Sequence, residues 1–229
     1  ENMISMSKLD NKKRLHKICD FLINNDNFGI FAHVHADGDA IGACVSLCLL
    51  LRSMGKKARV FYEENFNKTF SFLRKFDDES KIDNFECENY ICLDVSDRKR
   101  VYAPNNLRFN VCIDHHDVLS CGFSDLCYID KSYSSTCEII YELSKIMNLK
   151  VDDRICTCIY AGILFDTGRF KWSNVSERTF IVSSEIFHNV DKNINRKMFD
   201  NVPRNVIDFQ SEIIRRFKAD MFDFENIDF

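Results

Sequence analysis

The sequence predicts an α/β fold, a doubly wound and mostly parallel sheet flanked by helices. Three observations predict it: strand-like runs alternate with helical patterns, the runs are apolar throughout, and several of them end in acidic residues or histidines. Strands that are apolar throughout are typical of parallel sheets, which are buried on both faces. Such sheets bind ligands outside the carboxyl ends of their strands, so the polar residues there are the first candidates for a site.

The expected strands and helices follow one another along the chain. The strands are expected at residues 28–34, 58–62, 90–95 and 110–114. The helices are expected at residues 39–55, with Gly55 as the terminal cap, and at 136–147, 152–164, 175–188 and 203–218.

Composition limits the class of protein. A chain of 229 residues with 45% hydrophobic residues can bury a core without disulfides. The net charge of −4 argues against binding to long duplex nucleic acid, and no segment reads as a signal peptide or a membrane span. The 11 cysteines are odd in number and include no Cys-x-x-Cys pair, so we expect free thiols in a reducing, cytoplasmic setting.

The segment HVHADGDAIG, residues 33–42, crowds ionisable side chains at the end of the first strand. The carboxylates of Asp37 and Asp39, close to His33, would repel one another and lose hydration there unless a cation holds them. The alternative is that Asp39 caps the following helix and that His33 is a core histidine. Capping accounts for one aspartate but not for two together with a histidine.

Three later segments place similar residues at similar locations. LDVSD contains Asp94, which on its own could cap a helix, and GILFDTGRF puts Asp166 at a sharp turn after an apolar run. CIDHH places His115 and His116 side by side behind Asp114. Histidine is a common metal ligand and a natural proton carrier near neutral pH. Together the four segments predict one metal-binding site at the carboxyl edge of the sheet.

The segments HVHADGDAIG, LDVSD, IDHH and FDTGRF resemble, in this order, the four motifs of the DHH phosphoesterase superfamily. SSTCEIIYEL (134–143) and FKWSNVSERT (170–179) resemble its branch of oligoribonuclease/pAp phosphatases (nanoRNases) and cyclic-dinucleotide phosphodiesterases. The resemblance implies a catalytic domain over residues 1–190. Residues 191–229 would be a helical segment and linker toward a C-terminal substrate domain, whose Gly-Gly-His-type motif is absent from this chain.

The resemblance also implies a centre of two divalent ions, most often Mn²⁺, with Mg²⁺ or Co²⁺ as alternatives. One ion would be held by His33, Asp37 and Asp94, and the other by Asp39, Asp94, His115 and Asp166. The expected catalytic residues are Asp94, which bridges the ions, and His116, which orients the phosphate or protonates the leaving oxygen. Asp114 would orient the histidines, and three further residues would support the metals or contact the substrate, namely Ser135, Thr136 and Arg169.

The implied function is a manganese-dependent phosphohydrolase that uses metal-activated hydroxide. Its substrates would be small nucleotides or short oligonucleotides, namely short oligoribonucleotides, 3′-phosphoadenosine 5′-phosphate (pAp), or cyclic or linear dinucleotides. Two alternatives stay open: a hydrolase of the inorganic pyrophosphatase or exopolyphosphatase type, and a non-catalytic nucleotide-binding module. No membrane partner is expected, and the resemblance leaves a homodimer open.

Overall fold

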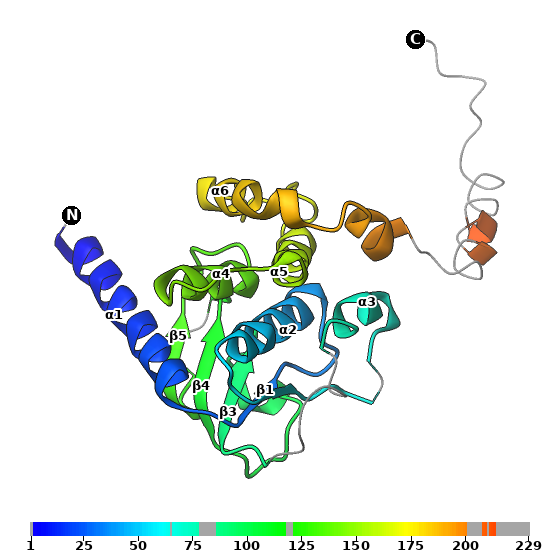
Figure 1. Cartoon of the computed structure of the whole chain (residues 1–229). Coiled ribbons are helices and arrows are strands. Elements are labelled where there is room, and N and C mark those ends of the chain that lie inside the picture. Colours follow the sequence, from blue (N-terminus) through cyan, green and yellow to red (C-terminus); the bar gives the residue numbers. More distant parts are fainter. Residues whose placement is uncertain are drawn as a thin grey trace.

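The computed structural model describes residues 2–64, 66–77, 86–117, 121–200, 208–209 and 211–213, with residues 2–10 as backbone only. Its centre is a five-stranded parallel sheet in the order β2-β1-β3-β4-β5 (Figure 1). The strands are β1 (Phe28–Phe31), β2 (Ala58–Val60), β3 (Asn89–Leu93), β4 (Phe109–Asp114) and β5 (Ser124–Ile129). In this order the winding direction reverses between β1 and β3, and in such sheets ligands bind beyond the strand ends at that point. The α/β fold predicted from the sequence is confirmed.

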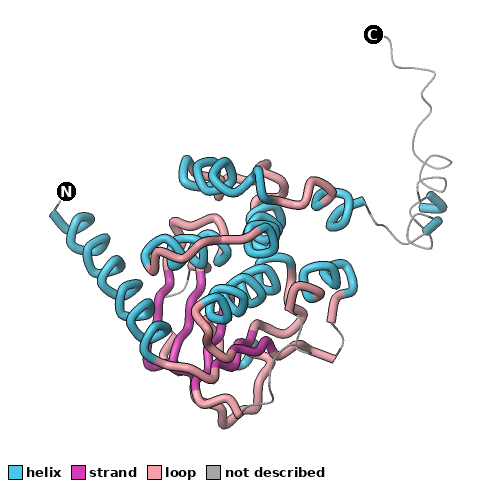
Figure 2. Tube along the Cα trace, viewed as in Figure 1, coloured by secondary structure: helices cyan, strands magenta, loops and turns pink. Residues whose placement is uncertain are grey.

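Most of the described helices lie on one side of the sheet, as Figure 2 shows. They are α1 (Asn2–Asn24), α2 (Gly38–Ser53), α3 (Ser71–Arg74), α4 (Thr136–Ile146), α5 (Asp153–Asp166) and α6 (Glu177–Ile186). Short helical turns are η1 (Lys68–Phe70), η3 (Arg98–Arg100), η4 (Phe187–Asn189) and η5 (Arg196–Asp200). Helices α2 and α4 contact the strands, α5 packs on both of them, and α6 packs on α4 and α5.

The pleat of the strands divides the core into two clusters, because successive side chains point to opposite faces of a sheet. Ile30 and Leu93 face the helices and join one large buried cluster with α1, α2, α4 and α5. Phe31, Cys92 and Cys112 face the other way and form a smaller cluster with loop residues. The strands are thus buried on both faces, as their apolar sequences predict.

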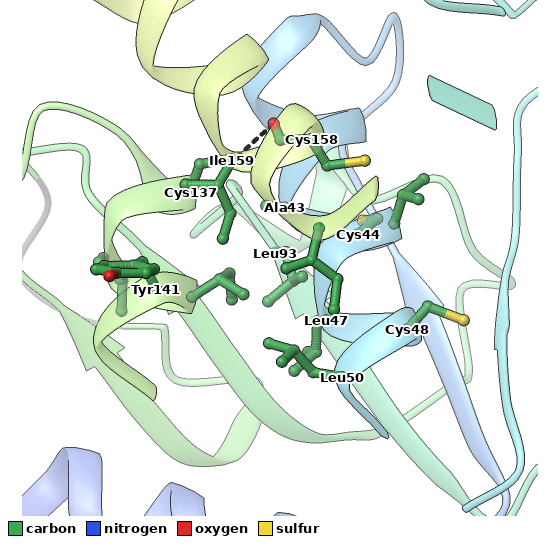
Figure 3. Packing of buried hydrophobic residues seen from close by; sticks show 14 of the residues in the cluster. Ala43, Cys44, Leu47, Cys48, Leu50, Leu93, Cys137, Tyr141, Cys158 and Ile159 are labelled. Atoms are coloured by element: carbon green, nitrogen blue, oxygen red, sulfur yellow. Dashed lines mark hydrogen bonds between the residues drawn. The ribbon is translucent and has the colours of Figure 1, made fainter. Parts of the chain in front are cut away.

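Glycines bring α2 and α5 unusually close together. A Cβ atom at Gly42 would lie 2.5 Å from the carbonyl oxygen of Cys158. A Cβ atom at Gly162 would collide with the side chains of Cys137 and Asp39. Figure 3 shows this core from close by, with the Cys137 thiol directed at the Cys158 carbonyl oxygen, 3.7 Å away. The close approach puts the end of α5 next to the start of α2, where the candidate site lies.

The four expected strands and the first four expected helices are all present, with ends that differ by a few residues. Helix α1 and strand β5 were not predicted. The expectation of free thiols is wrong for one pair, because Cys121 and Cys127 form a disulfide. The expected helix at 203–218 lies largely outside the described residues, so the division at residue 190 stays a prediction.

None of the helices in the described part of the chain combines the length and the apolar character that crossing a membrane requires.

Candidate metal centre

Acidic and histidine side chains from five segments meet beyond the carboxyl ends of β1, β3 and β4. The segments are the residues after each of these strands, the start of α2 and the end of α5. They bring together all six residues expected to bind metal, namely His33, Asp37, Asp39, Asp94, His115 and Asp166. The sequence places them far apart, and the sheet order makes them neighbours.

His33, Asp37 and Asp94 form the first group, with one potential ligand atom from each lying within 4.8 Å of the others. The Nδ1 atom of His33 is 2.8 Å from the carbonyl oxygen of Val34, which fixes the ring. Its Nε2 atom therefore faces two carboxylates, at 3.5 Å from Asp94 Oδ2 and 3.9 Å from Asp37 Oδ2. A second nitrogen anchored in this way is typical of a metal-binding histidine.

Asp37, and not Asp39, caps helix α2. Its Oδ1 atom accepts hydrogen bonds from the backbone N–H groups of Asp39 and Ala40, at 3.0 and 3.1 Å. The alternative interpretation of Asp39 as the cap is therefore wrong. The second carboxylate oxygen of Asp37 remains directed at His33.

Asp39, His115 and Asp166 form the second group. The Nε2 atom of His115 lies 2.8 Å from Asp166 Oδ2, 3.9 Å from Asp39 Oδ2 and 3.6 Å from Asp94 Oδ1. This nitrogen is buried and its geometry suits no hydrogen bond to any of the three. A buried imidazole nitrogen that faces three carboxylates and lacks a well-aligned hydrogen bond is suited to bind a cation.

The start of α4 holds two of the carboxylates. Asp39, which is fully buried, accepts the backbone N–H groups of Thr136 and Cys137 at 2.6 and 2.9 Å. The Thr136 hydroxyl donates to Asp94 Oδ1 at 3.0 Å. Ser135 caps α4 by accepting from the N–H of Glu138 at 3.2 Å. Thr136 therefore supports the carboxylates directly, whereas the Ser135 hydroxyl is engaged in its own helix.

Asp114 and His116 make a third group with Asp94 and His115, which the sequence did not predict as a set. Asp114 Oδ1 accepts from the backbone N–H groups of His115 and His116 and lies 2.7 Å from His116 Nδ1. The ring of His116 is thereby oriented, and its side chain is 51% exposed. These bonds fit the expectation that Asp114 orients the histidines.

The pKa values of the carboxylates and histidines show that the site favours positive charge. Burial, followed by repulsion from Asp94, raises the pKa of Asp37 to about 6 and raises that of Asp39 well above its usual range. Burial opposes the charge of His115, yet contacts with Asp166 and Asp39 raise its pKa to about 10. Burial also opposes ionisation of Asp94, but His33 and His115 lower its pKa overall. Without a cation, the carboxylates retain protons or depend on charged histidines.

A divalent cation fits this donor set. Among the described residues, no lysine or arginine pairs with the carboxylates of Asp37, Asp39, Asp94 or Asp166. Carboxylate oxygens and imidazole nitrogens are common ligands of divalent metals. The cluster could therefore hold metal, with Asp94 near both groups.

Arg169, expected from the sequence to contact the substrate or support the metals, lies apart from these groups, and so does His35 of the first segment. Arg169 is exposed, and its guanidinium carbon lies 4.9 Å from the centre of the Phe199 ring. His35 has a φ of +58°, is 86% exposed and donates its backbone N–H to Glu63 Oε2 at 2.8 Å. A substrate role for Arg169 stays a prediction.

The family model described as "DHH family, N-terminal domain" matches residues 27–163. The chain is 30% identical over 198 residues to the "Probable bifunctional oligoribonuclease and PAP phosphatase NrnA" of Streptococcus mutans, covering 85% of this chain and 63% of that protein. It is 31% identical over 169 residues to the "Bifunctional oligoribonuclease and PAP phosphatase NrnA" of Bacillus subtilis, covering 70% and 52%. The chain thus spans between half and two thirds of the length of these relatives.

Among solved structures, the fold is similar to an exopolyphosphatase-related protein from Bacteroides fragilis, with a TM-score of 0.76 and 23% identity, covering 89% of this chain and 65% of the other. That likeness concerns the fold alone. The family match includes every proposed metal ligand except Asp166, which follows its end by three residues. On this match, the chain belongs to the DHH family.

Proposed function

We propose that this chain is the metal-binding part of a manganese-dependent phosphohydrolase that cleaves phosphate esters of small nucleotides. The observation that carries the proposal is the buried Nε2 atom of His115, which lies 2.8 Å from Asp166 Oδ2 and within 3.9 Å of the carboxylates of Asp39 and Asp94. The proposed substrates are short oligoribonucleotides, pAp and dinucleotides. The names of the relatives from S. mutans and B. subtilis support the first two.

Seven ligand contributions from six residues would hold two ions. His33, Asp37 and Asp94 would hold one, and Asp39, Asp94, His115 and Asp166 the other, so that Asp94 serves both. When bound, such a pair of ions neutralises phosphate charge and helps to ionise the attacking water. The chain contributes the fixed positions, because Thr136 and the start of α4 hold Asp39 and Asp94 before any ligand arrives.

His116 would act on the substrate and not on the metals. Its Nδ1 atom is tied to Asp114, so Nε2 is left for the phosphate in a side chain that is half exposed. The bond to Asp114, which outweighs burial, raises the pKa of His116. A protonated ring can donate its Nε2 proton to the leaving oxygen, which is the role of a general acid.

The test is hydrolysis of a short RNA, pAp, a cyclic dinucleotide and pyrophosphate by the purified protein with Mn²⁺, Mg²⁺ or Co²⁺. We expect the nucleotides to be cleaved with Mn²⁺ and pyrophosphate to be a poor substrate. Preferred cleavage of pyrophosphate would support the pyrophosphatase alternative. Nucleotide binding without any cleavage would support the non-catalytic alternative.

A further inference from the structure

The turn between α5 and α6 has a strained but well-held backbone. Gly168, Arg169 and Phe170 have φ values of +54°, +62° and +63°, in a region that residues other than glycine rarely adopt. The buried hydroxyl of Thr167 donates to the carbonyl oxygen of Ile163 at 2.6 Å and accepts from the N–H of Phe170 at 3.0 Å. Strain of this kind persists only where the surroundings fix the conformation.

Asn174, in the same turn, connects two helix ends. Its side-chain nitrogen donates to the carbonyl oxygen of Asp166 at 2.8 Å and to that of Ser134 at 3.2 Å. An amide NH₂ group carries two hydrogens, so both bonds can form together. Asp166 is the last residue of α5, whose final carbonyl groups lack partners within the helix. Ser134 directly precedes the residue that caps α4.

These two helix ends hold different carboxylates of the candidate metal centre. The carboxylate of Asp166 lies 2.8 Å from His115 Nε2. The start of α4 binds Asp39 through two backbone N–H groups and Asp94 through the Thr136 hydroxyl. The spacing between Asp166 and the other two carboxylates therefore depends on how the end of α5 sits against the start of α4.

We propose that Asn174 is a positioning residue that fixes the Asp166 carboxylate at the correct spacing from Asp39 and Asp94. The inference rests on the proposed metal centre, because its measurable consequence is metal affinity. Asn174 is exposed, so replacing it opens no cavity in the core. Trp172, the single tryptophan, is 60% exposed and donates its backbone N–H to the carbonyl oxygen of Thr167 at 3.0 Å. Its fluorescence therefore reports on this turn.

The experiment compares the wild-type chain with Asn174→Ala, Asn174→Asp and the control Ser173→Ala. The aspartate keeps the shape of asparagine but turns an oxygen toward two carbonyl oxygens. Ser173 is exposed and forms no hydrogen bond within the described part of the chain. The readouts are Mn²⁺ affinity by calorimetry, bound Mn²⁺ by electron paramagnetic resonance, Trp172 emission during the titration, and thermal unfolding of the metal-free protein.

We expect Asn174→Ala to weaken one of the two Mn²⁺ sites by about 10- to 100-fold, the usual effect of removing a residue that orients a ligand. Asn174→Asp should weaken it further, and Ser173→Ala should match wild type. In an active enzyme, kcat should fall while KM stays constant. The melting temperature of the metal-free protein should change little, because the replaced side chain is exposed.

Each outcome separates this inference from the proposed function. Wild-type Mn²⁺ affinity in both Asn174 variants would overturn the inference, as would a lower melting temperature with unchanged affinity. The expected loss of affinity, in a protein that hydrolyses no nucleotide, would support the inference and overturn the proposed function. A wild-type chain that binds no Mn²⁺ would overturn both.

Discussion

This molecule has two buried acidic sites, and their carboxylates are neutralised in different ways. Asp77, whose side chain is fully buried, lies 2.6 Å from the guanidinium of Arg52 and accepts from the Tyr62 hydroxyl at 3.0 Å. The cluster around Asp94 has several carboxylates and, among the described residues, only histidines as cationic neighbours.

The two acidic sites should therefore contribute to different properties of the protein, one to its stability and the other to cation binding. Breaking a buried pair such as Arg52 with Asp77 leaves an uncompensated charge and costs folding energy. Removing a charge from a crowded carboxylate cluster relieves repulsion, and what is lost is the capacity to hold a cation. One site should therefore respond to mutation in its unfolding free energy, and the other in its metal affinity.

Asp94→Asn should have the largest effect, because Asp94 lies near both ligand groups. We expect loss of most bound Mn²⁺ at both sites and of measurable turnover. The stability of the metal-free protein should change less, because the variant loses the contacts of Asp94 with His33 and His115 but also its repulsion of Asp37 and Asp39. Elemental analysis and thermal unfolding measure the two effects. Undiminished metal content would remove Asp94 from its proposed bridging role.

Replacing His115 and His116 one at a time should show which of them binds metal and which donates a proton. His115→Ala should lower the occupancy of one ion, whereas His116→Ala should keep both ions and lose about 10²- to 10⁴-fold in turnover, the range for general acid catalysis. Metal content and single-turnover rates distinguish the two. Identical behaviour of the variants would show that this division of roles is wrong.

Arg52→Met tests the buried pair of Arg52 and Asp77, in which the protein itself neutralises the carboxylate. We expect a loss of about 3–5 kcal/mol in unfolding free energy, because Asp77 would stay buried without its partner. Mn²⁺ binding should be retained. Arg154→Met is the matched control, since Arg154 pairs with Asp152 at an exposed position and such pairs contribute roughly 0–1 kcal/mol. Equal losses in the two variants, measured by urea unfolding, would contradict the distinction between the sites.

The pH dependence of stability should give the smallest effect. Burial and the neighbouring Asp94 raise the pKa of Asp37 to about 6 and also raise those of Asp39 and Asp166. The folded, metal-free chain therefore binds more protons than the unfolded chain, and stability falls as pH rises through these values.

Between pH 5 and 7.5 the metal-free protein should lose on the order of 1–3 kcal/mol of unfolding free energy. Saturating Mn²⁺ should abolish the loss, because the cation replaces the protons. Urea unfolding with a chelator, across this pH range, measures it. Stability that rises with pH in the chelated protein would argue against a crowded carboxylate cluster.

The sequence predicted the candidate ligands and named Asp114 and Thr136 among the residues that support them, but it did not point to Asn174. His33, Asp39 and His115 stand out because charged residues at the end of apolar runs need a reason. Asn174 gives no such signal, since an asparagine in a polar turn is ordinary and its two partners are backbone carbonyl groups. Bonds to backbone depend on tertiary placement, which a single sequence does not reveal.

The same limit explains the errors in the fold. Strand β5, SDLCYI, mixes polar and apolar residues because it lies at the sheet edge, so it lacks the apolar run that identified the other strands. The disulfide joins Cys121 to Cys127 across a short loop, and neither spacing nor composition distinguishes these two cysteines from the others in the chain. Strand β2 lies at the other edge of the sheet and was predicted, so the apolar run, and not the position in the sheet, decided which strands could be recognised.

The scattering of the site residues along the chain has a consequence for biosynthesis. The ligand groups are brought together only when β1, β3, β4 and α5 are all in place, so a growing polypeptide would acquire the centre late, after Asp166 has left the ribosome and docked. A metal that binds the native chain alone shifts the folding equilibrium, by about 2.7 kcal/mol at a hundred times its dissociation constant. Under the proposed function, the supply of manganese in the cell would then influence how much of this protein survives proteolysis, as well as how fast it hydrolyses its substrate.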